Sequence, residues 1–141
     1  MKKDYTQWHK LKSYIEEYNE PILFREREIW WCSLGLNIGD EEDGKNEYFE
    51  RPILILRKFN KEIFWGLPMS TKTKDDIFHF NYSFDNNEKS SILLSQLRII
   101  SSKRLIRRLI TINENTFCEI RNSVDRLIKN ESDPIKGSSG A

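Results

Sequence analysis

The chain of 141 residues is 38% hydrophobic, 12% aromatic and 32% charged, and its formal net charge is +1. This length and composition predict one soluble globular domain with its own hydrophobic core, and no apolar run approaches the length of a membrane span. The two cysteines, Cys32 and Cys118, have no ligand-like spacing, so the sequence indicates neither a zinc site nor a disulfide framework. We therefore expect a cytoplasmic protein that does not contact membranes.

The small net charge conceals an asymmetry along the chain. Residues 1–90 carry more acidic than basic side chains, whereas residues 91–141 carry an excess of basic ones. The closely spaced basic residues are Arg98, Lys103, Arg104, Arg107 and Arg108. Such a cluster can face a polyanion, or it can coat an element and balance the acidic run 40–43 elsewhere on the surface.

The first predicted element is a helix over residues 4–18. Its apolar side chains recur at spacings of three and four and form a single stripe, made of Tyr5, Trp8, Leu11, Ile15 and Tyr18. Pro21 lies just beyond its end. We expect this helix to form an N-terminal extension, residues 1–24, that packs on the main domain, although a partner protein could also cover the stripe.

Five or six short strands are predicted next, separated by polar turns. The expected strands span residues 28–36, 51–58, 62–69, 77–84 and 91–100, and an acidic loop over residues 39–47 separates the first two. Asn60 and Lys61 form the short turn of a hairpin. Alternation in the fourth strand directs His79 outward, where it is an ordinary surface imidazole or, less simply, a catalytic one.

The end of the chain is predicted to return to helix. Ser101 is suited to cap a short helical turn that leads into a basic, partly apolar segment, and a second amphipathic helix spans about residues 113–129. Residues 131–141 form a tail that is flexible by composition. The pattern predicts a mainly β (α+β) fold over residues 25–130, a small twisted antiparallel sheet or barrel with a helix at each end.

The most informative polar residues lie at the ends of the two hairpin strands. Arg51 precedes Pro52 at the start of one strand, and the other strand ends in Ser70, Thr71 and Lys72. A guanidinium fork and two hydroxyls all donate to anionic oxygens, so this combination can hold a phosphate. The plain alternative is that Arg51 caps a buried strand and that residues 70–72 form an ordinary polar loop.

A second polar pair lies further along the chain. Gln96 and Arg98 are two residues apart in a predicted strand, and a period of two places their side chains on one face.

Taken together, these segments resemble the MazF/PemK family of bacterial toxins, the endoribonucleases of toxin–antitoxin pairs. The resemblance covers about residues 26–129. The matching segments, in the family's order, are Glu28-Ile29-Trp30, Gly39-Asp40-Glu41, Arg51-Pro52, Pro68-Met69-Ser70 and Gln96-Leu97-Arg98. Each motif is weak alone, whereas their order and spacing together are fairly specific.

The resemblance implies a small SH3-like barrel, also similar to CcdB, that acts as a homodimer and cleaves single-stranded RNA without a metal or other cofactor. It assigns catalytic positions to Arg51, Ser70 and Glu41. The residues expected to bind RNA are Thr71, Lys72, Gln96, Arg98 and Lys103. It also implies a cognate antitoxin whose acidic, partly disordered tail covers the same groove.

The sequence departs from the family pattern in its acidic loop and in its first 24 residues. Glu42 replaces the usual glutamine of the loop, and the loop before Arg51 is longer than is typical. An arginine is an awkward general base, because its pKa above about 12 leaves it protonated, so Glu41 or else His79 is the expected proton acceptor.

The alternative function is a catalytically inactive module on the same barrel that binds RNA or antitoxin, or that poisons a protein target as CcdB-like toxins do.

Overall fold

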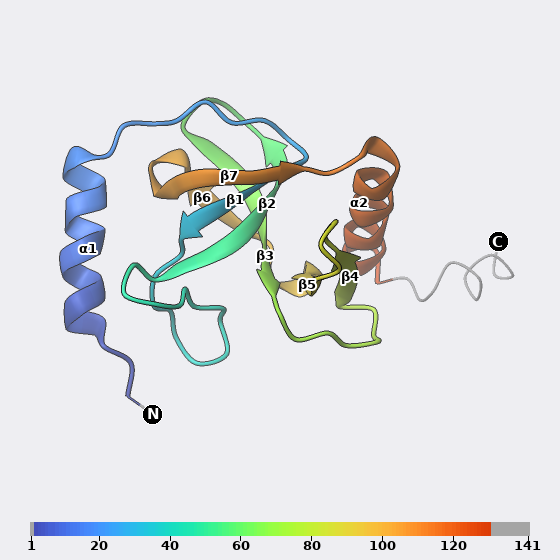
Figure 1. Ribbon diagram of the computed structural model, residues 1–141, viewed down its shortest axis with the longest axis horizontal. Coiled ribbons are helices and arrows are strands. Elements are labelled where there is room, and N and C mark those ends of the chain that lie inside the picture. Colours follow the sequence, from blue (N-terminus) through green and yellow to red (C-terminus); the bar gives the residue numbers. More distant parts are fainter. Residues whose placement is uncertain (1, 131–141) are drawn as a thin grey trace, which may run out of the picture.

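The computed structural model describes residues 2–130 and contains a curved antiparallel sheet of seven strands between two helices, α1 and α2, which lie on opposite sides of it (Figure 1). The elements in chain order are α1 (Tyr5–Tyr18), β1 (Glu28–Ser33), β2 (Glu50–Lys58), β3 (Ile63–Ser70), β4 (His79–Ser83), β5 (Lys89–Leu93), the 3-10 turn η1 (Leu94–Gln96), β6 (Arg98–Ser101), the 3-10 turn η2 (Ser102–Arg104), β7 (Leu105–Thr111) and α2 (Glu114–Ile128).

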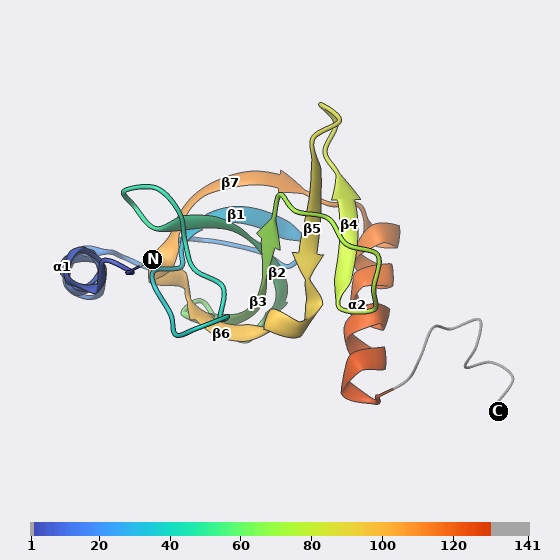
Figure 2. The same ribbon diagram turned by 90° about the horizontal axis from the view of Figure 1, so that it is seen from below.

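The strand order confirms the predicted fold class. The sheet runs β4-β5-β3-β2-β1-β7, and β6 pairs with β3. Figure 2 shows how strongly the sheet curves around its interior. Among residues 2–130 no pairing joins β6 to β7, so the expected barrel is an open one.

Hydrophobic side chains fill both faces of the curved sheet. Inside the curve, Phe24, Ile53 and Phe64 belong to one buried cluster, and on the other side α2 packs through Phe117 and Ile120 against a second cluster. Strands β2 and β3 carry apolar side chains on both faces of the sheet, so each face must be buried against another part of the chain. These two cores hold β2 and β3 rigidly in the centre of the sheet.

Helix α1 packs on the domain as predicted, although its apolar stripe is shorter than expected. Trp8 and Ile15 are buried, whereas Tyr5 and Tyr18 are 48% and 61% exposed. The Trp8 ring lies against Gly35, where an added Cβ would approach the ring to 2.0 Å. Gly35 also has a φ of +83°, so this position needs glycine both for its backbone and for the close approach.

The predicted strand over residues 91–100 is wrong in detail. The chain forms β5, then the turn η1, then β6, because β5 pairs with the end of β3 and β6 pairs with its beginning. The chain from Ile92 to Arg98 has three more residues than the stretch of β3 from Met69 to Gly66 that it must follow, and the turn η1 takes up these extra residues. This break and strand β7, in the basic segment after residue 104, raise the strand count to seven.

Of the remaining predictions, the two helix caps are confirmed and the orientation of His79 is wrong. Helix α2 begins after Asn113, whose side chain accepts a hydrogen bond from the Thr116 N–H, and Ser101 caps η2 through the Lys103 N–H, as expected. His79 does not point freely outward, because its side chain is only 18% exposed and contacts Asp76. The predicted tail lies outside the described residues. Within residues 2–130 no helix is both long and apolar enough to cross a membrane.

Candidate active site

Arg51 lies at the start of β2 and is buried, with its side chain 6% exposed. Its three guanidinium nitrogens each have an acceptor. Nη1 donates to the Met69 carbonyl at 2.9 Å, Nη2 pairs with the Glu42 carboxylate at 2.8 Å, and Nε donates to the Asp43 carbonyl. A buried charge requires such acceptors, so these contacts fix the guanidinium between the end of β3 and the β1–β2 loop.

Ser70 is the last residue of β3 and follows Met69, whose carbonyl accepts from Arg51 Nη1 at 2.9 Å. The β2–β3 ladder ends at the Ile53–Pro68 pair, and Ser70 pairs with Ser91 of β5. The Ser70 hydroxyl accepts from the Lys72 N–H at 3.2 Å and keeps its own proton available to donate.

Thr71 and Lys72 follow at the end of β3 and are exposed.

A pocket of about 410 Å³ lies next to Arg51 and brings together several of the predicted residues. Its lining residues are Asn37, Glu41, Glu42, Pro68, Ser95, Gln96, Leu97 and Arg98. Glu41, Gln96 and Arg98 thus share one pocket, and Glu42 connects that pocket to Arg51. The predicted reason for the proximity of Gln96 and Arg98 was wrong, because Gln96 lies in the turn η1 and not in a strand.

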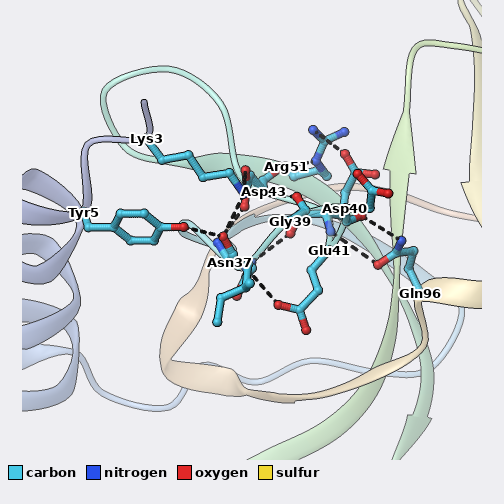
Figure 3. A network of polar contacts seen from close by, with 11 residues as sticks. Lys3, Tyr5, Asn37, Gly39, Asp40, Glu41, Asp43, Arg51 and Gln96 are labelled. Carbon is cyan, nitrogen blue, oxygen red and sulfur yellow. Dashed lines mark hydrogen bonds and ion pairs between the residues drawn. The ribbon is translucent and has the colours of Figure 1, made fainter. Parts of the chain in front are cut away.

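Gln96 ties the pocket to the acidic loop (Figure 3). Its amide donates to the Asp40 carbonyl at 3.3 Å and its oxygen accepts from the Glu42 N–H at 3.3 Å. Glu41 closes a turn within the loop, since its carboxylate accepts from the Ile38 N–H at 2.9 Å. These contacts order the loop next to Arg51.

The site places a fixed cation next to the acidic side chains of the loop. Burial lowers the pKa of Arg51 below its ordinary value, while the nearby charges of Glu42 and Asp43 act in the opposite direction. A guanidinium stays protonated in proteins, so Arg51 is a permanent positive charge. Among residues 2–130 no three His, Cys, Asp or Glu side chains are grouped as metal ligands would be. The arrangement suits anion binding by fixed donors.

Two candidates lie apart from this pocket. The Lys103 ammonium donates to the Glu16 carbonyl of α1 at 3.0 Å, so the structure brings this residue to the N-terminal helix and not to the other predicted RNA-binding residues. His79 pairs through Nδ1 with the Asp76 carboxylate at 2.5 Å, and this hydrogen bond lowers the pKa of Asp76.

The sequence did not predict which loop residues pair with the Arg51 guanidinium. Glu42 was noted only as a departure from the family pattern, and Asp43 only as part of an acidic run. The sequence contains a signal for such pairing, because an acidic run that precedes a buried arginine can supply its counter-charge. Which acid does so depends on the path of the loop.

Comparison with known proteins identifies a family and a shared fold. The family model for the PemK-like, MazF-like toxins of type II toxin–antitoxin systems matches residues 25–128. No protein with a curated description matches the sequence.

Solved structures with a similar fold include two toxins. The crystal structure of MazF (Form-I) from Deinococcus radiodurans has a TM-score of 0.62 at 16% identity, over 77% of this chain and 98% of that chain. The Mycobacterium tuberculosis toxin MazF-mt6 has a TM-score of 0.56 at 14% identity, over 73% of this chain and 97% of that chain. At these identities the likeness establishes the shared fold.

Proposed function

The chain belongs to the family of PemK-like, MazF-like toxins of type II toxin–antitoxin systems, and we propose that it is an endoribonuclease that cleaves single-stranded RNA without a metal ion. The observation that carries this proposal is the meeting of Arg51, the end of β3 and the pocket that holds Gln96 and Arg98. A strand of RNA can place a phosphate at the guanidinium and a neighbouring nucleotide in the pocket.

The proposed reaction is an attack of a ribose 2′-hydroxyl on the adjacent phosphorus. It leaves a 2′,3′-cyclic phosphate on one fragment and a 5′-hydroxyl on the other. Negative charge grows on the non-bridging oxygens during this step, and donors fixed in advance stabilise such charge. Arg51 supplies two-pronged donation to those oxygens, and the Ser70 hydroxyl donates from the opposite strand.

Proton transfer is assigned to the acidic loop. Glu41 lines the pocket and is exposed, so its carboxylate can reach a 2′-hydroxyl after a small loop movement. His79 pairs with Asp76 and lies outside the pocket lining, which makes it the weaker candidate. Arg51 stabilises the charge on the phosphate oxygens, and the leaving 5′-oxygen takes its proton from solvent water. Gln96, Arg98, Thr71 and Lys72 contact the RNA.

The same proposal includes the expected partners and location. Family membership implies an antitoxin, and we propose that its acidic tail competes with RNA for the cations of this site. We also propose a homodimer that acts in the cytoplasm.

A non-catalytic binding module is the second candidate, and one observation favours it. Every guanidinium nitrogen of Arg51 already has an acceptor within the chain. If the loop never releases Arg51, the protein binds RNA or antitoxin, or poisons a protein target as CcdB-like toxins do, without cutting RNA.

Cleavage of a long RNA in EDTA separates the two candidates. We expect discrete fragments with 5′-hydroxyl ends from the wild-type protein. Arg51→Ala should reduce the rate by about 100- to 1,000-fold, the usual loss for one such donor. Arg57→Ala is the matched control, because Arg57 lies on the same strand with its side chain 59% exposed.

The outcomes are distinct. Intact RNA at high wild-type concentration refutes the enzyme and favours the binding module. Cleavage by folded Arg51→Ala at the rate of Arg57→Ala removes Arg51 from the mechanism. Circular dichroism of each variant shows whether a lost activity reflects a lost fold.

A further inference from the structure

The N-terminal segment, which lies outside the family-matched residues, contacts the loop that holds Arg51. The Lys3 ammonium donates to the Asn37 carbonyl at 2.7 Å and pairs with the Asp43 carboxylate at 2.8 Å. The Tyr5 hydroxyl donates to the same Asn37 carbonyl at 2.8 Å. Figure 3 shows both side chains reaching from the start of α1 to the loop.

Asp43 joins the N-terminal segment to the candidate active site. Its carboxylate binds Lys3 through one oxygen and accepts from the Asn37 N–H at 2.6 Å through the other. Its backbone carbonyl accepts from Arg51 Nε. One residue therefore connects the ammonium of Lys3 to the guanidinium of Arg51.

The helix that follows Lys3 and carries Tyr5 is itself packed against the domain. Trp8, one turn along α1, is buried against Gly35 and Phe49, which flank the same loop. Lys3 and Tyr5 therefore extend from a docked helix and hold the loop against a fixed support.

The loop conformation that results leaves little of Arg51 for a ligand. The Glu42 carboxylate occupies Nη2, and the guanidinium side chain is only 6% exposed. A phosphate needs two adjacent N–H groups of the fork, so Glu42 must move before the phosphate can bind. Glu42 lies next to Asp43 in the chain, so the Lys3–Asp43 contact holds the backbone from which the Glu42 side chain reaches Arg51.

We infer that Lys3 and Tyr5 are positioning residues that clamp the 37–43 loop over Arg51 and restrict the access of RNA to it. The inference rests on the proposed function in assigning a phosphate to Arg51. The clamp itself is a property of the loop and does not depend on cleavage. It makes the N-terminal extension a regulator of the site.

The clamp has a defined kinetic consequence. When only a fraction of molecules has an open loop, the apparent affinity for a ligand falls by that fraction. Release of the clamp therefore lowers KM for RNA and leaves kcat nearly unchanged, because the chemistry follows binding. A residue with only a structural role would lower the active fraction and would not lower KM.

The test compares the full-length double variant Lys3→Ala/Tyr5→Phe with a matched control, Lys12→Ala/Tyr14→Phe. The control removes the same charge and the same hydroxyl from exposed positions on α1. Three readouts are measured for each protein. They are hydrogen exchange of the loop amides, the rate of Arg51 modification by phenylglyoxal followed by peptide mass spectrometry, and KM and kcat on a single-stranded RNA.

We expect the clamp variant to exchange its loop amides and to modify Arg51 about 5- to 10-fold faster than the control, with a similar fall in KM, as expected for the loss of a weak ion pair and a hydrogen bond. Lys3→Arg should keep the wild-type values. Exchange and modification equal to the control overturn the inference, and so does an unchanged or raised KM. If the wild-type protein does not cleave RNA, the proposed function fails, while exchange and modification still decide the clamp.

Discussion

Replacement of Glu42 by glutamine should make the protein less stable and its candidate site more accessible. The Glu42 carboxylate pairs with Arg51 Nη2 at 2.8 Å, with side chains 25% and 6% exposed. Glutamine has the same shape and keeps an oxygen acceptor for the guanidinium, but it removes the charge. The change therefore isolates the electrostatic part of the contact.

The expected magnitudes follow from the burial of the pair. A fully buried pair costs about 3–5 kcal/mol when one partner is removed, whereas an exposed pair is worth about 0–1 kcal/mol. Glu42 is a quarter exposed and the glutamine oxygen still accepts, so Glu42→Gln should lower the free energy of unfolding by about 1–2 kcal/mol. A phosphate no longer competes with a carboxylate at Nη2, so the affinity for RNA should rise by about 5- to 30-fold.

Two assays measure these effects on the same protein. Urea unfolding followed by tryptophan fluorescence gives the change in stability, and titration of a fluorescent single-stranded RNA gives the change in affinity. Glu47→Gln is the matched control, because Glu47 is exposed on the same loop and its substitution removes the same charge. Affinity that rises equally in both variants would assign the effect to net charge alone. Lower affinity in Glu42→Gln would refute the view that Glu42 blocks Arg51.

Three further predictions concern the rest of the fold. Trp8→Ala should weaken the docking of α1 by about 3 kcal/mol, because Trp8 is 6% exposed, and faster hydrogen exchange of the α1 amides would show it. Burial raises the pKa of Cys32 to about 12, so a thiol reagent at pH 8 should label exposed Cys118 alone in the native protein and both cysteines in denaturant. The hydrogen bond from His79 lowers the pKa of Asp76. The stabilisation that this contact provides is therefore complete above the ordinary aspartate pKa of 3.8, and it is lost as the pH falls through the lowered pKa of Asp76. Asp76→Asn should therefore destabilise the protein at pH 6, and its difference from the wild type in urea unfolding should shrink towards about pH 3; a difference that does not change with pH would contradict the assignment.

Elements whose formation depends on local sequence were predicted well. The apolar spacing of α2 and its Asn113 cap lie within one stretch of chain, and so do the strands and turn of the β2–β3 hairpin. The break at residues 94–96 was missed because it depends on distant pairing. Both β5 and β6 pair with β3, and nothing local in a continuous apolar run indicates that their registers on β3 differ by three residues.

The candidate site shows the same division. The contact of Arg51 with the end of β3, through the Met69 carbonyl, follows from the β2–β3 hairpin, which the sequence allows one to anticipate. The contacts from Lys3 and Gln96 to the loop join segments that are far apart in the chain. Lys103 was predicted to bind RNA because it follows the Gln96–Arg98 segment. Its ammonium instead contacts the Glu16 carbonyl of α1, and no local pattern indicates that contact.

The pairing of Arg51 links the stability of the fold to the state of the site. A guanidinium that is 6% exposed needs acceptors, and in the absence of a phosphate only the chain itself can provide them. The acceptors that it uses come from the end of β3, which is part of the sheet, and from residues 42 and 43 of the β1–β2 loop, whose contacts with Arg51 are polar. A ligand phosphate can replace the loop acceptors but not the Met69 carbonyl, so binding should exchange one set of partners for another without exposing an unpaired charge. The N-terminal extension acts on the replaceable set, since Lys3 binds Asp43. Any change that strengthens its hold on the loop should therefore stabilise the protein and weaken RNA binding together.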